Sequence, residues 1–352
     1  MGHPIRNLLL MTLLLSSIGL LSVYNASVAE AFNDFGDKYY FAKQQLVWLL
    51  AGFAIFFVLS SLPFKLIKKL IPVAFFISLI FMIAVIIPGV GLKVQGARRW
   101  IDLGVSTVQP SEFFKLSLLL YLAYWLEKPR RFRSFIAILV GSLILIMLQP
   151  DLGTAIIVGT TSFLVYYLSG SPLKELFCVL AIAFTLGFVL IAMSPYRLAR
   201  VHTFLNPTVD PLGSGYHINQ VILGLGSGGY FGVGLGRSIQ KHSYLPEATT
   251  DSIFAVIGEE MGFAGGVAII AGLLILSLYC LKLALLSKNN FAKVVIGSIG
   301  GLIGIQSFVN LSAMVALIPL TGVPLPLISY GGSSLITTFS ALGILTSATK
   351  ES

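Results

Sequence analysis

The sequence has few charged residues. Only 11% of its 352 residues are Asp, Glu, Lys or Arg, whereas 56% are hydrophobic. A soluble globular domain usually carries about 25% charged residues, so a water-soluble fold of this length could not bury so much apolar surface. The ten-residue alternation typical of a membrane β-barrel is also missing. Apolar runs of about 18 residues or more recur instead, and they indicate an all-α, polytopic membrane protein.

Cysteine is also scarce, and no large soluble segment is present. Cys178 and Cys280 both lie inside apolar runs, which favours packing roles over a disulfide. No stretch between the apolar runs is long enough to form a separate domain. No internal repeat is evident, which weighs against the inverted-repeat transporter architectures. We therefore expect residues 1–352 to form a single integral membrane domain.

Ten apolar runs predict about ten transmembrane helices. They lie near 7–27, 46–62, 70–88, 111–126, 135–149, 152–169, 175–194, 252–281, 291–317 and 332–349. Arg6 and the small residues of 26–31 give the first run some features of a signal peptide, but we interpret it as the first membrane helix. The fifth and sixth runs almost adjoin, so they should form a tight hairpin.

The basic residues predict the orientation. The net charge of +9 comes mostly from Lys and Arg beside apolar runs, as the positive-inside rule expects, so it does not indicate nucleic-acid binding. With a cytoplasmic N-terminus, thirteen basic residues fall on short inside connections and nine on longer outside ones. Both termini are then cytoplasmic. Two long outside loops result, near 89–110 and, between helices seven and eight, 195–250, and long loops usually carry function.

Ionisable residues at membrane helices are costly and are therefore functional candidates. Glu112 and Lys115, three residues apart in one helix, can pair; a structural ion pair and a role in substrate binding both remain open. Asp151 follows Pro150 at the tip of the hairpin. Capping of the next helix is the favoured interpretation for Asp151, and a substrate contact is the alternative.

Asp251 is the sharpest candidate for chemistry. It precedes a long apolar helix at the outer membrane surface, where the helix dipole stabilises an ionised carboxylate. An ionised carboxylate facing a lipid-side cleft suits a general base for a sugar hydroxyl, and helix capping is an equal alternative. Glu259 and Glu260, about 12 Å deeper in that helix, are expected to cap broken helix ends or to pair with basic residues; a proton relay is the alternative.

The loop at 224–236 contains a formal G-x-G-x-x-G at Gly224, Gly226 and Gly229. No strand precedes it, so a dinucleotide site is rejected. Glycines at this density allow the backbone to approach a lipid-linked sugar, or simply to form a compact re-entrant fold. Near the end of the chain, three prolines precede 328–334, which suggests a broken re-entrant segment.

Arginines in the outer loops are candidates for a diphosphate ligand, because guanidinium groups bind phosphate bidentately. Plain contacts to anionic lipids are the alternative. The residues are Arg98, Arg99, Arg197 and Arg200.

Seven motifs, in order along the chain, resemble the SEDS family of peptidoglycan glycosyltransferases, which includes the FtsW and RodA types. They are GARRW at 96–100, QPSE at 109–112, QPDLGT at 149–154, GSGGYFGVGLG at 226–236, LPEATTD at 245–251, GEE at 258–260 and PLPLISYGGSS at 324–334. The family pattern often has His before Thr-Asp and Phe after it, where this chain has Thr249 and Ser252. The sequence around the acid is more similar to the division type, FtsW, than to RodA.

The resemblance implies a glycosyltransferase that polymerises lipid II outside the cytoplasmic membrane by inverting transfer. Asp251 matches the family's essential acid and would deprotonate the incoming 4-hydroxyl. The diphosphate leaving group would need cationic stabilisation from arginines or from a divalent cation such as Mg²⁺ or Mn²⁺. The candidate substrate-binding residues are Arg98, Arg99, Glu112, Lys115, Asp151, Arg197, Arg200, Ser329 and Gly331.

The expected partners are lipid II, undecaprenyl-diphosphate-linked glycan, membrane lipids and a class B penicillin-binding protein. Two other functions remain open. A lipid II flippase would need a charged central cavity, yet beyond the helix ends Lys115 is the only basic residue within a predicted helix. A non-catalytic scaffold for the transpeptidase would tolerate replacement of its ionisable residues.

Overall fold

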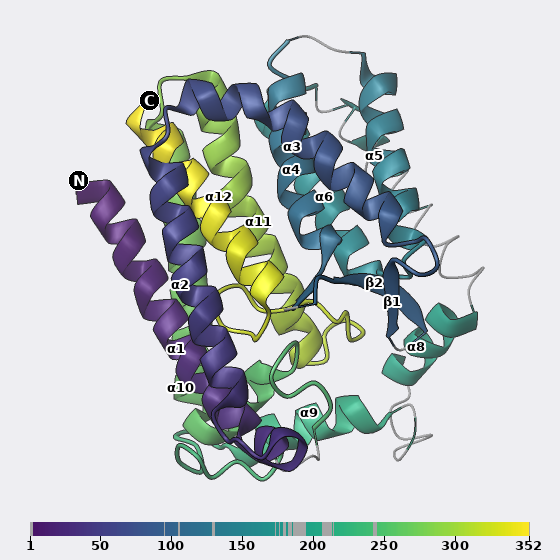
Figure 1. The fold of residues 1–352 in the computed structure, drawn as a ribbon, viewed down its shortest axis with the longest axis vertical. Coiled ribbons are helices and arrows are strands. Elements are labelled where there is room, and N and C mark those ends of the chain that lie inside the picture. The colour runs from purple at the N-terminus through teal and green to yellow at the C-terminus, as the bar shows by residue number, and fades with distance from the viewer. Residues whose placement is uncertain are drawn as a thin grey trace. The chain divides into compact units, whose positions relative to one another are not determined.

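The computed structural model describes residues 3–94, 96–104, 106–128, 131–172, 174–175, 177–178, 181, 185, 195–205, 213, 215–241 and 245–351. Most of them are helical (Figure 1). Nine of the ten expected apolar runs are helices in this part of the chain. The seventh run, 175–194, lies largely outside the described residues.

The nine helices correspond to the expected runs, with ends that differ mostly by a few residues. They are α1 (His3–Phe35), α2 (Tyr40–Ser61), α3 (Phe64–Ala84), α4 (Pro110–Trp125), α5 (Phe132–Met147), α6 (Leu152–Leu168), α10 (Ile253–Leu286), α11 (Asn290–Met314) and α12 (Gly332–Lys350). Two further helices, α8 (Pro195–Leu205) and α9 (Tyr216–Ser227), lie in the loop 195–250. The sequence did not predict them, because they are short and flanked by Gly and Pro.

Five helices in the described part are long and apolar enough to cross a membrane, namely α1, α2, α3, α10 and α11. The apolar helices α5 and α6 have 16 and 17 residues, at the lower limit for a transmembrane helix. Four residues separate them, which confirms the predicted tight hairpin.

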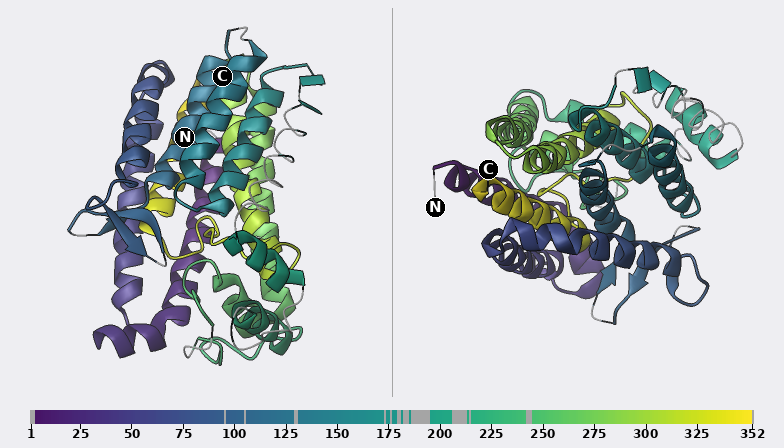
Figure 2. Two further views of the ribbon diagram at one scale, coloured as in Figure 1. Left: turned by 90° about the vertical axis from the view of Figure 1, so that its right-hand side faces the viewer. Right: turned by 90° about the horizontal axis from the view of Figure 1, so that it is seen from above.

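The outer loop 89–110 is not irregular. It contains a three-stranded antiparallel sheet of β1 (Gly91–Val94), β2 (Ala97–Asp102) and β3 (Thr107–Val108), in that order. Figure 2 shows this small sheet. Gly96 and Gly104 have positive φ in the two turns, and Asp102 Oδ1 accepts a hydrogen bond from Gly104 N at 2.8 Å. These residues suit tight turns, so the sheet follows from local signals.

The described chain forms two compact units, which we call the first and second units. The first contains Met1–Leu49, Phe184–Leu276 and Gln306–Gly331, and the second contains Leu50–Ala183, Ser277–Ile305 and Gly332–Ser352. The helices α2, α10 and α11 each contribute to both.

In the second unit, α4 is a central helix. It packs against α3, α6 and α12, and α5 packs against α6. Nearly every side chain of α4 is buried, including those of Glu112 and Lys115. Most of helix α12 is buried too, although it is rich in Ser and Thr. Thr337 and Thr346 donate to the carbonyls four residues earlier, so these hydroxyls are satisfied inside their own helix.

In the first unit, α10 is broken at Gly262, where φ is 68° and ψ is −167°. The break interrupts the regular helical hydrogen bonds, and the glycine-rich loop replaces them. Val233 N donates to Glu259 O at 3.0 Å, and Phe263 N donates to Gly229 O at 2.8 Å. The loop backbone thus satisfies groups that the bilayer could not hydrate.

The glycines of this loop are needed for close backbone packing. A Cβ on Gly228 would overlap Gly258 O, and one on Gly232 would overlap Glu260 O. A Cβ on Gly262 would overlap the backbone nitrogen of Gly232. Of the two roles left open for the loop, the compact re-entrant fold therefore accounts for these glycines.

The substitution Gly262→Ala should destabilise the protein strongly. Alanine in this backbone region, which essentially only glycine occupies, costs about 1–3 kcal/mol, and its Cβ would in addition collide with the loop backbone. We expect a large drop in the midpoint of thermal unfolding in detergent. Gly226→Ala is the matched control, because a Cβ there meets no atom within 4 Å. Equal stability of the two variants would show that the packing of the break on the loop is not important.

Candidate active site

The carboxylate of Asp251 lies in the turn that leads into α10. Asp251 is 8% exposed, and the turn is closed by Ser252 N and Thr250 N, which both donate to Glu247 O at 3.1 and 3.2 Å. The helix begins at Ile253, and Ser252 O accepts its first hydrogen bond. Asp251 therefore stands one residue outside the usual capping position.

Hydroxyl groups surround this turn. Thr250 Oγ1 lies 3.3 Å from Asp251 Oδ1 and donates to Glu247 Oε2 at 2.8 Å. Ser252 Oγ lies 2.7 Å from His217 Nε2, a residue of α9. The carboxylate thus lies in a polar turn at the start of an apolar helix, with the Thr250 hydroxyl beside one of its oxygens.

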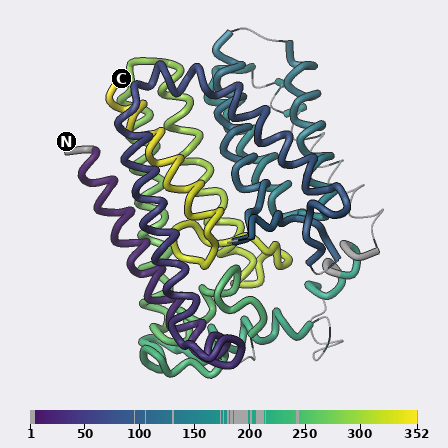
Figure 3. The backbone as a smooth tube through the Cα atoms, viewed as in Figure 1, coloured from purple at the N-terminus to yellow at the C-terminus, as the bar shows by residue number. Residues whose placement is uncertain are grey.

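The Asp251 turn is bound to the segment between α11 and α12, which Figure 3 traces as a yellow-green loop. Tyr330 N donates to Thr249 O at 2.9 Å. Asn310 Nδ2 donates to Asp251 O at 2.9 Å and to Val323 O at 2.7 Å. Two motifs about 80 residues apart in the sequence, LPEATTD and PLPLISYGGSS, therefore meet within the first unit.

Ser329, a predicted substrate-binding residue, is buried in that segment. Its Oγ accepts a hydrogen bond from Leu325 N at 2.8 Å, and its carbonyl accepts one from Gln45 Nε2 at 3.2 Å. These contacts stabilise the loop itself. Gly331 directly follows Tyr330, which joins the segment to the Asp251 turn.

Glu259 and Glu260 have structural contacts in the first unit. Glu259 accepts hydrogen bonds from Ser238 Oγ and from the backbone nitrogens of Ile239 and Gln240. Glu260 pairs with Lys241 at 3.3 Å, and Asn25 Nδ2 donates to it at 3.2 Å. The predicted pairing with a basic residue is confirmed for Glu260, whereas Glu259 caps a loop rather than a helix end.

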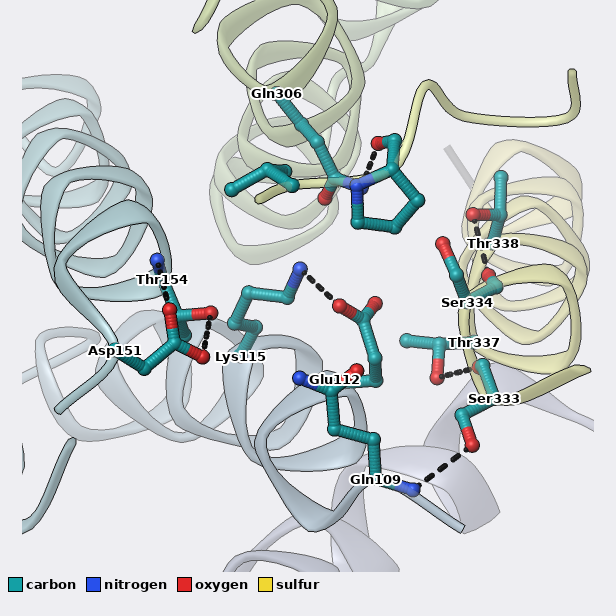
Figure 4. Close-up of polar contacts among 12 residues, drawn as sticks. Gln109, Glu112, Lys115, Asp151, Thr154, Gln306, Ser333, Ser334, Thr337 and Thr338 are labelled. Carbon is teal, nitrogen blue, oxygen red and sulfur yellow. Dashed lines mark hydrogen bonds and ion pairs between the residues drawn. The ribbon is translucent and has the colours of Figure 1, made fainter. Parts of the chain in front are cut away.

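In the second unit, Glu112 and Lys115 form the predicted ion pair, with 2.7 Å between Oε1 and Nζ (Figure 4). Both residues are only 3% exposed. Just before them, Gln109 N donates to Ser333 Oγ at 3.0 Å, which joins the first turn of α4 to the first turn of α12.

Asp151 caps α6, as the sequence favoured. Its Oδ1 accepts from Thr154 N at 3.0 Å, and its Oδ2 accepts from Thr154 Oγ1 at 2.8 Å (Figure 4). Because α6 packs on α4, the carboxylate and the ion pair belong to adjacent helices of one unit.

The predicted arginines differ in their contacts. Arg99 Nε donates to Gln149 O at 2.9 Å, and a terminal guanidinium nitrogen donates to Pro150 O, so Arg99 fastens the sheet to the α5–α6 hairpin. Arg98 is its neighbour on β2 and pairs with Lys93 of β1, beside an irregularity in the strand register. Arg197 and Arg200 belong to α8, and their side chains lie outside the described part of the structure.

Two buried polar atoms in this region have no hydrogen-bond partner among the described residues. They are Ser111 Oγ, in the first turn of α4, and Gln149 Oε1, before α6. The described residues include no group of three or more His, Cys, Asp or Glu side chains placed to hold a metal ion.

Comparison with known proteins identifies the family. A family model described as "Cell cycle protein" and named for FtsW, RodA and SpoVE matches residues 6–352. The chain belongs to the FtsW/RodA/SpoVE family. The resemblance stated from the motifs is thereby confirmed, and the chain is a polytopic, all-α membrane protein.

Several relatives cover almost the whole chain. Stage V sporulation protein E of Bacillus subtilis is 38% identical over 98% of this chain and 96% of its own length. A probable peptidoglycan glycosyltransferase FtsW of Trichlorobacter lovleyi is also 38% identical, over 96% of this chain and 91% of its own.

Solved structures share the fold. One, described as "Structural coordination of polymerization and crosslinking by a peptidoglycan synthase complex", has a TM-score of 0.81 and 28% identity, covering 98% of this chain and 97% of that one. The rod shape determining protein RodA of Thermus thermophilus has a TM-score of 0.72 and 28% identity, over 98% of this chain and 96% of its own.

Sequence reasoning missed the amide side chains that hold the region together. Gln45, Gln149 and Asn310 each donate to backbone carbonyls that are distant in the sequence. A signal was present for Asn310, because an amide inside an apolar run is costly unless it has partners. The identity of the acceptors could not be inferred from the spacing of residues along the chain.

The ion pair in α4 should be sensitive to the loss of one partner. Lys115→Met leaves Glu112 buried without its cation, and breaking a buried pair costs about 3–5 kcal/mol. The double variant Glu112→Gln/Lys115→Met should recover most of that loss in thermal unfolding. Lys68→Met, which breaks the exposed pair with Glu127, should cost less than about 1 kcal/mol. A double variant less stable than either single one would contradict this account.

Substitutions at Asp151 separate capping from charge. Asp151→Ala removes the cap of α6 and should lower the free energy of unfolding by about 0.5–2 kcal/mol. Asp151→Asn keeps an acceptor for Thr154 N, so it should unfold close to wild type. If Asp151→Asn retains stability but loses activity, then its charge acts on the substrate in addition to capping.

Proposed function

We propose that this protein is a peptidoglycan glycosyltransferase that polymerises lipid II into glycan strands at the outer face of the cytoplasmic membrane. The support comes from family membership over residues 6–352 and from relatives that bear this name at up to 38% identity. The observation that carries the mechanism is the carboxylate of Asp251, held in a turn that a second motif of the same unit fixes in place.

Asp251 is the proposed general base. Its carboxylate takes the proton of the 4-hydroxyl of the GlcNAc in the incoming lipid II. The freed oxygen forms a bond to C1 of the terminal MurNAc, while the bond from C1 to the diphosphate breaks. Undecaprenyl diphosphate leaves with the bonding electron pair, and attack from the opposite face inverts the configuration at C1.

We further propose that residues of the second unit contact the anionic part of the substrate. The first turns of α4 and α12 meet at the Gln109–Ser333 hydrogen bond, and helix N-termini favour anions. The buried Ser111 Oγ, which has no partner among the described residues, lies in the same turn of α4, so a donor is available there. Lys115 and Arg98 supply positive charge, and Arg99 positions the sheet that carries Arg98.

The remaining assignments rest on the same proposal. Glu112 orients Lys115 through the ion pair, and Asp151, Ser329 and Gly331 shape the substrate site. Arg197, Arg200 or a divalent cation such as Mg²⁺ or Mn²⁺ is a further candidate for balancing the diphosphate charge. Both termini are cytoplasmic, as the distribution of Lys and Arg favours. The partner is a class B penicillin-binding protein. The role is in cell division or in cell shape and elongation, and the FtsW-like sequence around Asp251 favours division.

The decisive test is polymerisation of lipid II by the purified protein with its cognate transpeptidase. Asp251→Asn keeps the size of the side chain and removes its basicity, so we expect loss of polymer with an unchanged unfolding temperature. Glu247→Gln is the matched control, because Glu247 is an exposed carboxylate of the same turn; it should polymerise at close to the wild-type rate.

The outcomes separate the competing functions. Polymer from wild type and Glu247→Gln, but none from folded Asp251→Asn, supports the assigned base. Equal amounts of polymer from all three proteins would overturn the assignment of Asp251 as the base, but the proposed glycosyltransferase function would stand. Lipid II translocation across vesicles without any polymer would identify a flippase, and transpeptidase activation without either activity would identify a scaffold.

A further inference from the structure

The helix α11 carries an asparagine whose contacts are unusual for a membrane helix. Asn310 is 1% exposed, and its Nδ2 donates to two backbone carbonyls, Asp251 O at 2.9 Å and Val323 O at 2.7 Å. Both acceptors lie outside regular helix, one in the turn before α10 and one in the segment before α12. One side chain therefore fastens the turn of the proposed base to a second broken segment.

The chemistry requires an amide at this position. Both neighbours are carbonyl oxygens, so the atom between them must carry two N–H groups, which fixes the orientation of the side chain. A carboxylate would place an oxygen against two oxygens, and an aliphatic side chain would leave both carbonyls without this donor. Asn310 Oδ1 is buried and has no hydrogen-bond partner among the described residues. The position thus retains an unsatisfied acceptor, which indicates that the two donors are what it needs.

The hydrogen bond from Asn310 to the backbone carbonyl of Asp251 acts close to the Asp251 carboxylate, the proposed base. Asp251 O and the carboxylate belong to the same residue, and Tyr330 N holds Thr249 O two residues earlier at 2.9 Å. The turn is therefore bound on both sides of the base to the chain that surrounds Ser329 and Gly331. Rotation of the Asp251 peptide would displace the Cα from which the carboxylate projects, and only the Cα–Cβ and Cβ–Cγ bonds lie between that Cα and the carboxylate.

We propose that Asn310 is a positioning residue for glycosyl transfer, which fixes the backbone from which the Asp251 carboxylate projects, through the carbonyl of the same residue. This inference rests on the proposed function, and Asn310 itself does not contact the reacting atoms. A base displaced by about 1 Å can lose about 100-fold in rate. The loss should appear in kcat, because substrate binding does not require the correct direction of the base.

The experiment compares Asn310→Leu and Asn310→Asp with wild type in the lipid II polymerisation assay, together with the transpeptidase. We expect kcat to fall about 100-fold in both, with KM for lipid II close to the wild-type value. Gln306→Leu is the matched control. Gln306 lies one turn earlier in α11 and donates to Pro324 O at 2.9 Å. Gln306 thus holds the segment between α11 and α12 through a carbonyl outside the Asp251 turn. The kcat of Gln306→Leu should therefore fall only slightly.

A merely structural role would give a different result. It would lower the yield and the unfolding temperature of all three variants alike, with kcat per folded molecule unchanged. If the Leu and Asp variants fold poorly, Asn310→Ser keeps one donor in a smaller side chain and should show a kcat between those of wild type and Asn310→Leu. Wild-type kcat in folded Asn310 variants would overturn the inference, whereas an inactive wild type would overturn the proposed function instead.

Discussion

Backbone groups that leave a helix inside a bilayer must find partners in the protein, because lipid offers none. In this protein two such interruptions, at Gly262 and in the segment before α12, lie in the unit that carries Asp251. The first is closed by backbone groups of the glycine-rich loop. The second is held by amide side chains of Gln45, Gln306 and Asn310. Of these bonds, the one from Asn310 acts directly on the turn of the proposed base, through the carbonyl of Asp251.

The two solutions have different sequence requirements. Backbone-to-backbone closure needs glycine, since a Cβ at Gly228, Gly232 or Gly262 would overlap a facing main-chain atom. Closure by side chains needs amides, which donate two N–H groups from one position. The Gly-rich motif and the isolated Asn and Gln residues in apolar helices therefore serve the same physical purpose, although only the former is conspicuous in the sequence.

The buried charges follow a similar rule. Glu112 with Lys115, and Glu260 with Lys241, are each paired within a single unit, because an unpaired charge in a low-dielectric interior is strongly unfavourable. Asp151 is satisfied by the first turn of its own helix. At Asp251 the carboxylate lies beside the hydroxyl of Thr250, and the backbone of the turn is held from both sides. That arrangement fixes the backbone from which the proposed base projects.

The sequence by itself determined the class, the helices and the candidate acid. Apolar runs report burial in lipid directly, and i, i+3 spacing or a Pro-Asp step reports local contacts such as the Glu112–Lys115 pair and the Asp151 cap. It did not predict the sheet at 91–108, whose strands are short, or α8 and α9. Only the tertiary structure showed that Asn310 joins Asp251 to Val323 and that the glycine loop closes the break in α10. Those bonds connect residues that are distant in the chain, and the spacing of residues along a sequence carries no information about which distant carbonyl an amide will meet.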